Sequence, residues 1–449
     1  MELENENSIM SLRITGLFGN EEVLIPFDGN VKILMGENGT GKTTILNILY
    51  YTLTLNYSRL INLPFNSVEL IFSSGAILHI VRNELDSYLI PDRESYAFNR
   101  LSSSLTKKEL FQLIRVVRTK SMEDFYKYFS ENHDSVEIPA RVVYRELSEM
   151  PVVTKESKFD QDIVKENVHD EILYFPTYRR IEEDLNNLGF KRMNINDELL
   201  IKFGLNDVER LIEELKSKIK EISIKWFSKV NGEMLSQLIT GISVNEEMKE
   251  SLNNQEALKI VLGRIGTNLK QENKEQISEL VASDEFYNSE KYAPLLYFLS
   301  NLVKIYDQQK ELDNAIKGFV AACNKYLKVS KKEFIYDESN VELTLYRNRK
   351  QVKEKITLST LSSGEKQIVS LFSRLYLDTT NSKFIIIFDE PELSLSTEWQ
   401  SELLPDILAS QKCSFLFAVT HSPFIFDNSL DSYARSLEMY ITEVTEKEG

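Results

Sequence analysis

The segment Gly36–Thr43 reads GENGTGKT and limits what this chain can fold into more than any other stretch. It matches the phosphate-binding pattern G-x-x-x-x-G-K-[ST] at every fixed position. The apolar run Val31–Met35 before it predicts a short strand, and the apolar residues of Thr44–Tyr50 after it recur at helical spacing. Strand, glycine-rich turn and helix form the context in which this pattern binds a nucleoside triphosphate.

The chemistry of the loop explains its spacing. Glycines allow successive backbone N–H groups to point into one concavity, and the helix start adds partial positive charge there. We expect Lys42 to reach the β- and γ-phosphates and the Thr43 hydroxyl to ligate Mg²⁺. The candidate nucleotide-binding residues of this segment are Gly36, Glu37, Asn38, Gly39, Thr40, Gly41, Lys42, Thr43 and Thr44.

The composition is that of a soluble globular protein. The chain has 449 residues, 42% of them hydrophobic and 27% charged, which is enough for two or three domains. An apolar run of membrane-spanning length and a signal peptide are both absent from the sequence, and the two cysteines lie far apart. We therefore expect a cytoplasmic protein without a membrane partner.

The net charge of −16 opposes nucleic-acid binding as the main activity, because contacts to phosphates supply most non-specific affinity. Basic residues do cluster at 107–120, 179–192 and 347–355. For each cluster alone, a solvated surface of a helix or hairpin is favoured over a nucleic-acid contact.

The pattern along the chain divides it into four segments. Residues 1–86 are expected to form an N-terminal nucleotide-binding lobe with the glycine-rich loop, and 87–180 its mostly helical remainder, ending in the strand and turn of Glu171–Arg180. Residues 181–331 have apolar residues at spacings of three and four, which predict either a short antiparallel helical arm or a compact helical lobe. Residues 332–449 form the C-terminal lobe.

Two acidic residues follow a buried strand in that lobe. Phe384–Glu392 reads FIIIFDEPE, a continuous apolar run typical of a central parallel strand. Asp389 is placed to hold Mg²⁺ through water beside Thr43, and Glu390 to polarise the water that attacks the γ-phosphate. The alternation of strands and helices here predicts a parallel α/β core.

A second anion site is predicted in Leu361–Gln367, which reads LSSGEKQ before a predicted helix. Small hydroxyl residues and a glycine at a helix start bind anions for the same dipole and N–H reasons. Since the chain already contains one phosphate cradle, the second suggests a nucleotide that is held by another copy. The candidate residues are Ser362, Ser363, Gly364 and Glu365.

Five segments together resemble the ABC-type ATPases, in the order of that family. GENGTGKTT, LSSGEKQ, FDEPE, SLSTEWQ (Ser394–Gln400) and THSP resemble its Walker A, signature, Walker B, D-loop and H-switch. The resemblance implies an α/β head with a mixed sheet, an antiparallel β-subdomain and a helical insertion between Walker A and the signature. It also implies ATP and Mg²⁺ as cofactors, and homo-oligomers built through head dimers that sandwich ATP.

The same resemblance assigns roles to individual residues. Lys42 binds the phosphates, Glu390 is the general base and His421 senses the γ-phosphate. The signature residues Ser362–Gly364 contact the γ-phosphate that is held by the partner head.

The long insertion makes the chain similar to the SMC, RecF and OLD subgroup. The insertion is too short for an SMC arm, no C-x-x-C marks a zinc hook, and little chain follows His421 for a Toprim domain. LFGNEEVLIPF and FPTYRRIEEDL resemble the AriA-type ATPases of the PARIS anti-phage system, with Septu-type ATPases next. That resemblance implies a sensor and scaffold that restrains a separately encoded effector nuclease, Toprim first and HNH next, and releases it on sensing a phage protein.

Two questions stay open at this level. A DNA-binding repair ATPase of the RecF kind is the alternative function. Phe18–Asn20 is either an adenine contact or a packed turn.

Overall fold

The computed structural model describes residues 8–37, 39–85, 89–91, 100–119, 121–133, 138–148, 152–154, 157–176, 205–265, 269–349, 352–379 and 383–443. The chain forms two compact units. The first comprises 1–177, 383–392 and 413–449, and the second comprises 178–382 and 393–412. Each unit thus combines segments that are far apart in the sequence, and the division into four consecutive segments stays a prediction.

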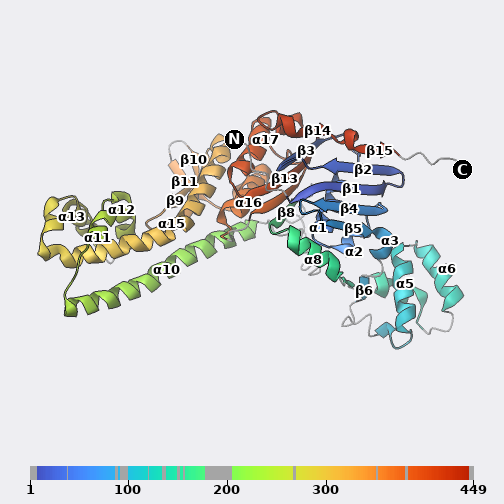
Figure 1. Cartoon of the computed structure of the whole chain (residues 1–449), viewed down its shortest axis with the longest axis horizontal. Helices are drawn as coiled ribbons and strands as arrows, with labels where there is room; N and C mark the ends of the chain where they lie inside the picture. The colour runs from blue at the N-terminus through green and yellow to red at the C-terminus, as the bar shows by residue number, and fades with distance from the viewer. Residues whose placement is uncertain are drawn as a thin grey trace. The chain divides into compact units, whose positions relative to one another are not determined.

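A parallel five-stranded sheet is the centre of the first unit (Figure 1). Its order is β14 (Ala434–Ser436), β3 (Val31–Met35), β13 (Cys413–Thr420), β12 (Phe384–Asp389) and β8 (Glu171–Phe175). All neighbouring pairs run parallel. Every residue of β12 is buried, which explains why its sequence is a continuous apolar run and not an alternating one.

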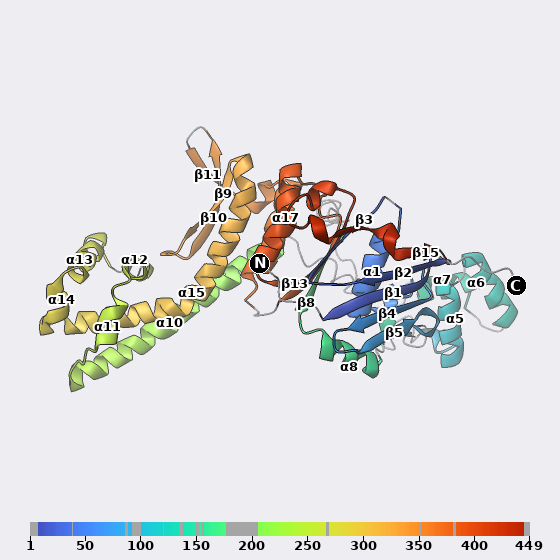
Figure 2. The ribbon, with the colours of Figure 1, turned by 45° about the horizontal axis from the view of Figure 1, so that its top comes forward.

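An antiparallel five-stranded sheet lies beside it in the same unit (Figure 2). Its order is β15 (Ile441–Glu443), β2 (Glu21–Pro26), β1 (Ile9–Leu17), β4 (Ser67–Phe72) and β5 (Ile77–Val81). Helix α1 (Lys42–Leu53) contacts β12 and β13. Apolar side chains of both sheets and of α1 form one shared core, so the glycine-rich loop is anchored on both sides.

A small helical subregion completes the first unit. Helices α5 (Lys107–Thr119), α6 (Met122–Asn132) and α7 (Ala140–Ser148) surround their own core, which contains Leu113, Phe125 and Val143. The shorter elements of this unit are α2 (Tyr57–Leu60), α3 (Arg82–Leu85), β6 (Leu89–Pro91), β7 (Val152–Thr154) and α8 (Lys158–Asn167).

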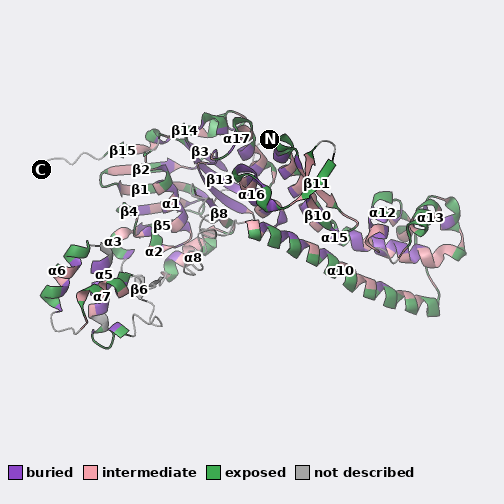
Figure 3. Cartoon of the chain, turned by 180° about the vertical axis from the view of Figure 1, so that it is seen from behind, coloured by how far each residue is buried: buried purple, intermediate pink, exposed green. Residues whose placement is uncertain are grey.

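Two long helices dominate the second unit, α10 (Leu205–Thr240) and α15 (Ala293–Leu327). They pack antiparallel, and α10 exposes most of its outer face (Figure 3). Four short helices pack with them around a common apolar core: α11 (Glu246–Ser251), α12 (Gln255–Arg264), α13 (Gln271–Val281) and α14 (Asp284–Asn288). The structure therefore combines both alternatives left open by the sequence, an antiparallel arm and a compact helical group.

A buried polar network ties the two long helices to their neighbours. Arg264 of α12 donates two hydrogen bonds, of 2.9 and 2.7 Å, to the carboxylate of Asp313 on α15. Gln309 Nε2 donates to Ile219 O at 2.9 Å and to Ser223 Oγ at 2.8 Å on α10. Buried charges are tolerated when they are paired in this way, so the network fixes how the helices pack.

The rest of the second unit is a three-stranded antiparallel sheet and two helices. The sheet has the order β11 (Val352–Ile356), β10 (Glu342–Arg349) and β9 (Lys332–Asp337), and the helices are α16 (Ser363–Leu377) and α17 (Thr397–Ala409). Strand β11 ends at Ile356, and residues 358–360 form a 3₁₀ turn that leads into the signature segment. Helix α15 packs against both α16 and β9.

The expected fold class is confirmed: an α/β head with parallel and antiparallel sheets and a helical insertion between the glycine-rich loop and the signature segment. Among the described residues, no helix combines the length and apolar character that a membrane span requires.

Candidate functional site

The glycine-rich loop connects β3 to α1 and has the backbone that its glycines predict. Gly39 has φ +90° and Gly41, the residue before α1, has φ +82°, a region that favours glycine. Lys42 Nζ donates hydrogen bonds of 2.7 Å to the carbonyl oxygens of both Gly36 and Glu37. These two bonds hold the Lys42 ammonium against the loop itself, and only 5% of the residue is exposed. Asn38 lies outside the described residues.

Phe18 lies against this loop. A Cβ atom at Gly41 would be 2.8 Å from Phe18 Cε2, so the ring and the loop backbone are in close contact. Phe18 has φ +50° and is 48% exposed, an unusual backbone and an unusual exposure for a phenylalanine. The structure thus places an aromatic face next to the phosphate-binding loop.

The sheet brings Thr43 and Asp389 together. The order β3, β13, β12 places the ends of three parallel strands at one edge, the usual ligand edge of such sheets. There Thr43 Oγ1 donates a 2.8 Å hydrogen bond to Asp389 Oδ2, and Asp389 is fully buried. One hydroxyl and one carboxylate are oxygen ligands that suit Mg²⁺, which commonly takes its remaining ligands from phosphates and water. The donors present therefore fit the expected ion, although the described residues include no group of three or more His, Cys, Asp or Glu side chains that could hold a metal ion by themselves.

Glu390 follows Asp389 in a strained backbone conformation. Its φ is +46°, and its N–H donates a 2.9 Å hydrogen bond to Val419 O on β13. A left-handed conformation at a non-glycine residue costs free energy and recurs at functional sites. Burial raises the pKa of Glu390, and the neighbouring Asp389 carboxylate raises it further. Glu390 is thus a better proton acceptor at neutral pH than an exposed glutamate.

His421 approaches the same carboxylates. It directly follows β13, and its Nδ1 lies 3.8 Å from Glu390 Oε1. The same nitrogen lies 2.9 Å from Glu392 Oε1. The side chain of His421 is 44% exposed, so the ring is accessible from outside the sheet edge.

Glu392 is a residue of the site that the sequence reasoning missed. Its Oε1 accepts hydrogen bonds from Thr420 Oγ1 at 2.7 Å, from His421 N at 2.9 Å and from Ser422 N at 3.1 Å. The second glutamate of the DEPE run was the available signal, but the sequence gives no reason to connect it to a segment near residue 421.

The signature residues lie in the second unit, at the start of α16. Ser362 caps the helix, with its Oγ accepting from Glu365 N at 3.4 Å, and Ser362 and Ser363 are both exposed. Gly364 is buried, and a Cβ atom there would lie 2.3 Å from the carbonyl oxygen of Ser394. Ser394 opens the D-loop segment and has φ +66°. The signature and the D-loop are therefore packed backbone to backbone.

Glu365 has a different environment from its serine neighbours. Its Oε2 accepts from Ser362 N and Lys332 Nζ, each at 2.6 Å, and its Oε1 accepts from Ser330 Oγ at 2.5 Å. Only 2% of Glu365 is exposed. Its carboxylate therefore supports the signature segment from inside the unit, while Ser362 and Ser363 face outward.

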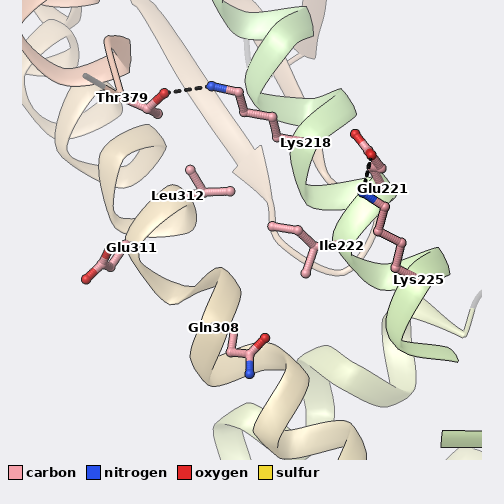
Figure 4. Close-up of a pocket in the computed structure, with 8 residues that line it drawn as sticks. All are labelled: Lys218, Glu221, Ile222, Lys225, Gln308, Glu311, Leu312 and Thr379. Carbon is pink, nitrogen blue, oxygen red and sulfur yellow. Dashed lines mark hydrogen bonds and ion pairs between the residues drawn. The ribbon is translucent and has the colours of Figure 1, made fainter. Parts of the chain in front are cut away.

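A groove between α10 and α15 is separate from these residues. It encloses about 370 Å³, and Figure 4 shows residues that line it. Lys218 Nζ donates to Thr379 Oγ1 at 2.8 Å, and Lys225 pairs with Glu221 at 2.6 Å. Its lysines are thus already bonded to neighbours, and it contains none of the predicted nucleotide-binding residues.

One lysine of the basic clusters is engaged within its own unit: Lys353, in the 347–355 cluster, pairs with Glu333 at 2.9 Å. The cluster at 179–192 lies outside the described residues.

The model of the AAA ATPase domain family (AAA_15) matches residues 8–426. A comparison with curated proteins finds no match. Similar solved structures include an SMC head bound to the C-terminal winged-helix domain of ScpA, with 11% identity, a TM-score of 0.32, and coverage of 93% of this chain and 90% of that chain.

Two further SMC head structures match with similarly low sequence identity and TM-score. One, from Pyrococcus furiosus, has an extended coiled coil and is bound to the C-terminal domain of ScpA; it shares 14% identity with a TM-score of 0.32, covering 93% of this chain and 91% of that one. The other, from Pyrococcus yayanosii, has a coiled coil and joint; it shares 14% identity with a TM-score of 0.30, covering 93% of each chain. With the family model extending from β1 past the H-switch, this chain belongs to the AAA ATPase domain family of P-loop ATPases.

Proposed function

We propose that this chain binds ATP with Mg²⁺ and hydrolyses it at the sheet edge formed by β3, β12 and β13. The observation that carries the proposal is the contact between Thr43 and Asp389, 2.8 Å apart although they are distant in sequence, with Glu390 beside them. A loop built to surround phosphates, an oxygen pair suited to Mg²⁺ and a carboxylate with a raised pKa are the parts that phosphoryl transfer to water requires.

Each side chain then has a defined task. Lys42, now bonded to two loop carbonyls, exchanges these contacts for phosphate oxygens and balances their charge. Bound Mg²⁺ supplies further neutralisation of phosphate charge beside Thr43 and Asp389. Glu390 orients a water molecule and accepts its proton, a role that its raised pKa favours.

We further propose that the site is completed by a second copy of the chain. Ser362 and Ser363 are exposed at the N-terminus of α16, where helix dipole and N–H groups favour an anion. In a head dimer this surface contacts the γ-phosphate held by the partner's loop. The chain then forms homo-oligomers whose assembly depends on ATP.

Two variants test this function. Lys42→Ala is expected to abolish ATP binding, and Glu390→Gln is expected to bind ATP normally, to hydrolyse it at least about a hundredfold more slowly and to accumulate ATP-bound oligomers. Equilibrium binding, phosphate release and light scattering measure these outcomes. Normal ATP affinity in Lys42→Ala would show that the site is wrongly assigned.

A mixing experiment tests the composite site. Lys42→Ala and Ser363→Arg each remove one half, so each variant alone is expected to be inactive. Mixed in equal amounts, the two are expected to recover part of the activity, because one of the two sites in a mixed dimer has both halves intact. No recovery over a range of ratios, in a mixture shown to form mixed oligomers, would contradict the composite site.

At the level of biology, we propose a sensor and scaffold of a bacterial anti-phage complex. The support is the resemblance of the N-terminal and central segments to AriA-type ATPases of the PARIS system. In this role the ATP-bound oligomer restrains a separately encoded Toprim or HNH nuclease and releases it when a phage protein binds. Co-expression with a nuclease gene adjacent in the genome tests it: a stable complex that survives purification with ATP and dissociates when the trigger is added is expected.

The rival function is a RecF-like repair ATPase. It predicts DNA-stimulated hydrolysis and a DNA affinity that falls steeply with salt. Absence of both in the same preparation would eliminate it.

A further inference from the structure

Glu392 joins the end of the DEPE run to the segment that carries His421. Three donor groups of residues 420–422 form hydrogen bonds to its Oε1: the Thr420 hydroxyl and the N–H groups of His421 and Ser422, at 2.7, 2.9 and 3.1 Å. His421 Nδ1 lies 2.9 Å from the same oxygen, at ion-pair distance. Only 4% of the Glu392 side chain is exposed, so water does not replace these bonds.

The geometry also separates the two glutamates around His421. Nδ1 is 2.9 Å from Glu392 but 3.8 Å from Glu390, so the ring lies closer to Glu392. The Glu390 carboxylate is therefore the one that remains for the water of the proposed reaction.

The other oxygen of Glu392 distinguishes a carboxylate from an amide at this position. Within the described part of the chain, Oε2 is buried and has no hydrogen-bond partner. A glutamine would retain an acceptor for the same donors, but its NH₂ group would occupy a place where those residues offer no acceptor. A buried donor without a partner is costly, so the amide is a poor substitute.

We propose that Glu392 is a positioning residue of the ATPase reaction: it holds residues 420–422, and with them the His421 ring, beside the active carboxylates. The inference rests on the proposed function of the site. Glu392 contacts no reacting atom and acts through His421.

Kinetics on a double-mutant cycle test the proposal. Glu392→Gln and Glu392→Ala are expected to lower kcat by about 10- to 100-fold, the usual effect of removing an orienting partner, with ATP affinity changed less than about twofold. His421→Gln is expected to have a similar effect. Because Glu392 acts through His421, Glu392→Ala in the His421→Gln background is expected to lower kcat by less than about twofold more. Glu438→Gln, an exposed glutamate of the same unit, is the matched control and should behave as wild type.

Full additivity of the two substitutions would overturn the proposal, since it would show that Glu392 acts independently of His421. Thermal melts of all variants accompany the kinetics. If Glu392→Ala fails to fold, the cycle is carried out with Glu392→Gln.

A spectroscopic measurement tests the same idea without turnover. The chain has four histidines, so ¹⁵N-histidine labelling gives few signals, and the spectrum of His421→Gln identifies those of His421. The His421 ring signals are expected to shift in Glu392→Ala and to keep their wild-type positions in Glu438→Gln, because only the first variant releases residues 420–422. Unchanged His421 signals in Glu392→Ala would refute the inference. If the wild type proves unable to hydrolyse ATP, the proposed function fails, while the His421 signals still report on Glu392.

Discussion

The Lys332 ammonium lies 2.6 Å from Glu365 Oε2, and both residues are buried, 8% and 2% exposed. Lys332 begins β9, directly after the long helix α15 and its short 3₁₀ extension, and Glu365 is in the first turn of α16. Glu365 also accepts from the N–H of Ser362. One buried ion pair thus connects the base of the helical arm to the backbone of the signature segment.

This pair predicts a pH-dependent stability. Burial alone would raise the pKa of Glu365, but the hydrogen bonds from Lys332, Ser330 and the Ser362 N–H outweigh it and lower that pKa below its usual value of 4.5. Since the folded pKa is below the unfolded one, the carboxylate stabilises the fold above about pH 4.5, and this contribution is lost as the pH falls through the folded pKa.

Glu365→Gln is therefore expected to reduce the free energy of unfolding by about 3 kcal/mol at pH 7, because it leaves a buried Lys332 without its counter-charge. Urea denaturation at pH 7, 5 and 4 should show this difference shrink at the acid end. Glu342→Gln, an exposed glutamate on β10, serves as control. A difference that stays constant down to pH 4 would contradict the ion-pair explanation.

Gly364→Ala tests the contact between the signature and the D-loop. The new Cβ would lie 2.3 Å from Ser394 O, a backbone atom that cannot move alone, so the start of α16 or the D-loop must shift. We expect ATP binding to remain within about twofold of wild type, because the loop and its ligands lie in the other unit. We also expect a loss of ATP-dependent oligomers, because overpacking typically costs about 1–3 kcal/mol. Light scattering with and without ATP measures the outcome. Gly232→Ala, in α10 with open space around it, is the matched control; normal assembly in Gly364→Ala would refute the prediction.

Thr43 is predicted to act through its hydroxyl. Thr43→Ala removes the donor to Asp389 and a Mg²⁺ ligand, so we expect the Mg²⁺ concentration for half-maximal ATPase activity to rise about tenfold or more. Thr43→Ser retains the hydroxyl and is expected to remain near wild type. Titration of Mg²⁺ at fixed ATP measures both variants. Equal defects in the two would point to the methyl group and packing instead.

Phe18 is predicted to contact the base of the nucleotide. Stacking on an aromatic ring contributes about 1–3 kcal/mol per base, so Phe18→Ala is expected to weaken ATP binding at least about fivefold. Binding of inorganic triphosphate, which has no base, should not change, and Phe18→Trp should bind ATP well. Phe159→Ala removes another exposed phenylalanine, 71% exposed on α8, and serves as control. If triphosphate binding weakens equally, Phe18 supports the loop and does not contact the base.

Local patterns were sufficient for the elements that carry the chemistry. The fixed positions of Gly36–Thr43 require a loop between a strand and a helix, and the structure has β3 and α1 there. The apolar run before Asp389 predicted a strand buried on both sides, as found in β12. Strand β9 was not predicted, because Lys332–Asp337 begins with two charged residues and has only a brief apolar alternation.

The sequence by itself determined the types of residue at the site, because phosphate and Mg²⁺ chemistry demands glycines, a lysine, a hydroxyl and carboxylates at fixed local spacing. Tertiary structure alone decided which of them meet. The parallel order β3, β13, β12 brings Thr43 to Asp389 and His421 to two glutamates, and it sets the His421 ring closer to Glu392 than to Glu390. Strand order joins residues that are hundreds of positions apart, and local spacing contains no information about such distances.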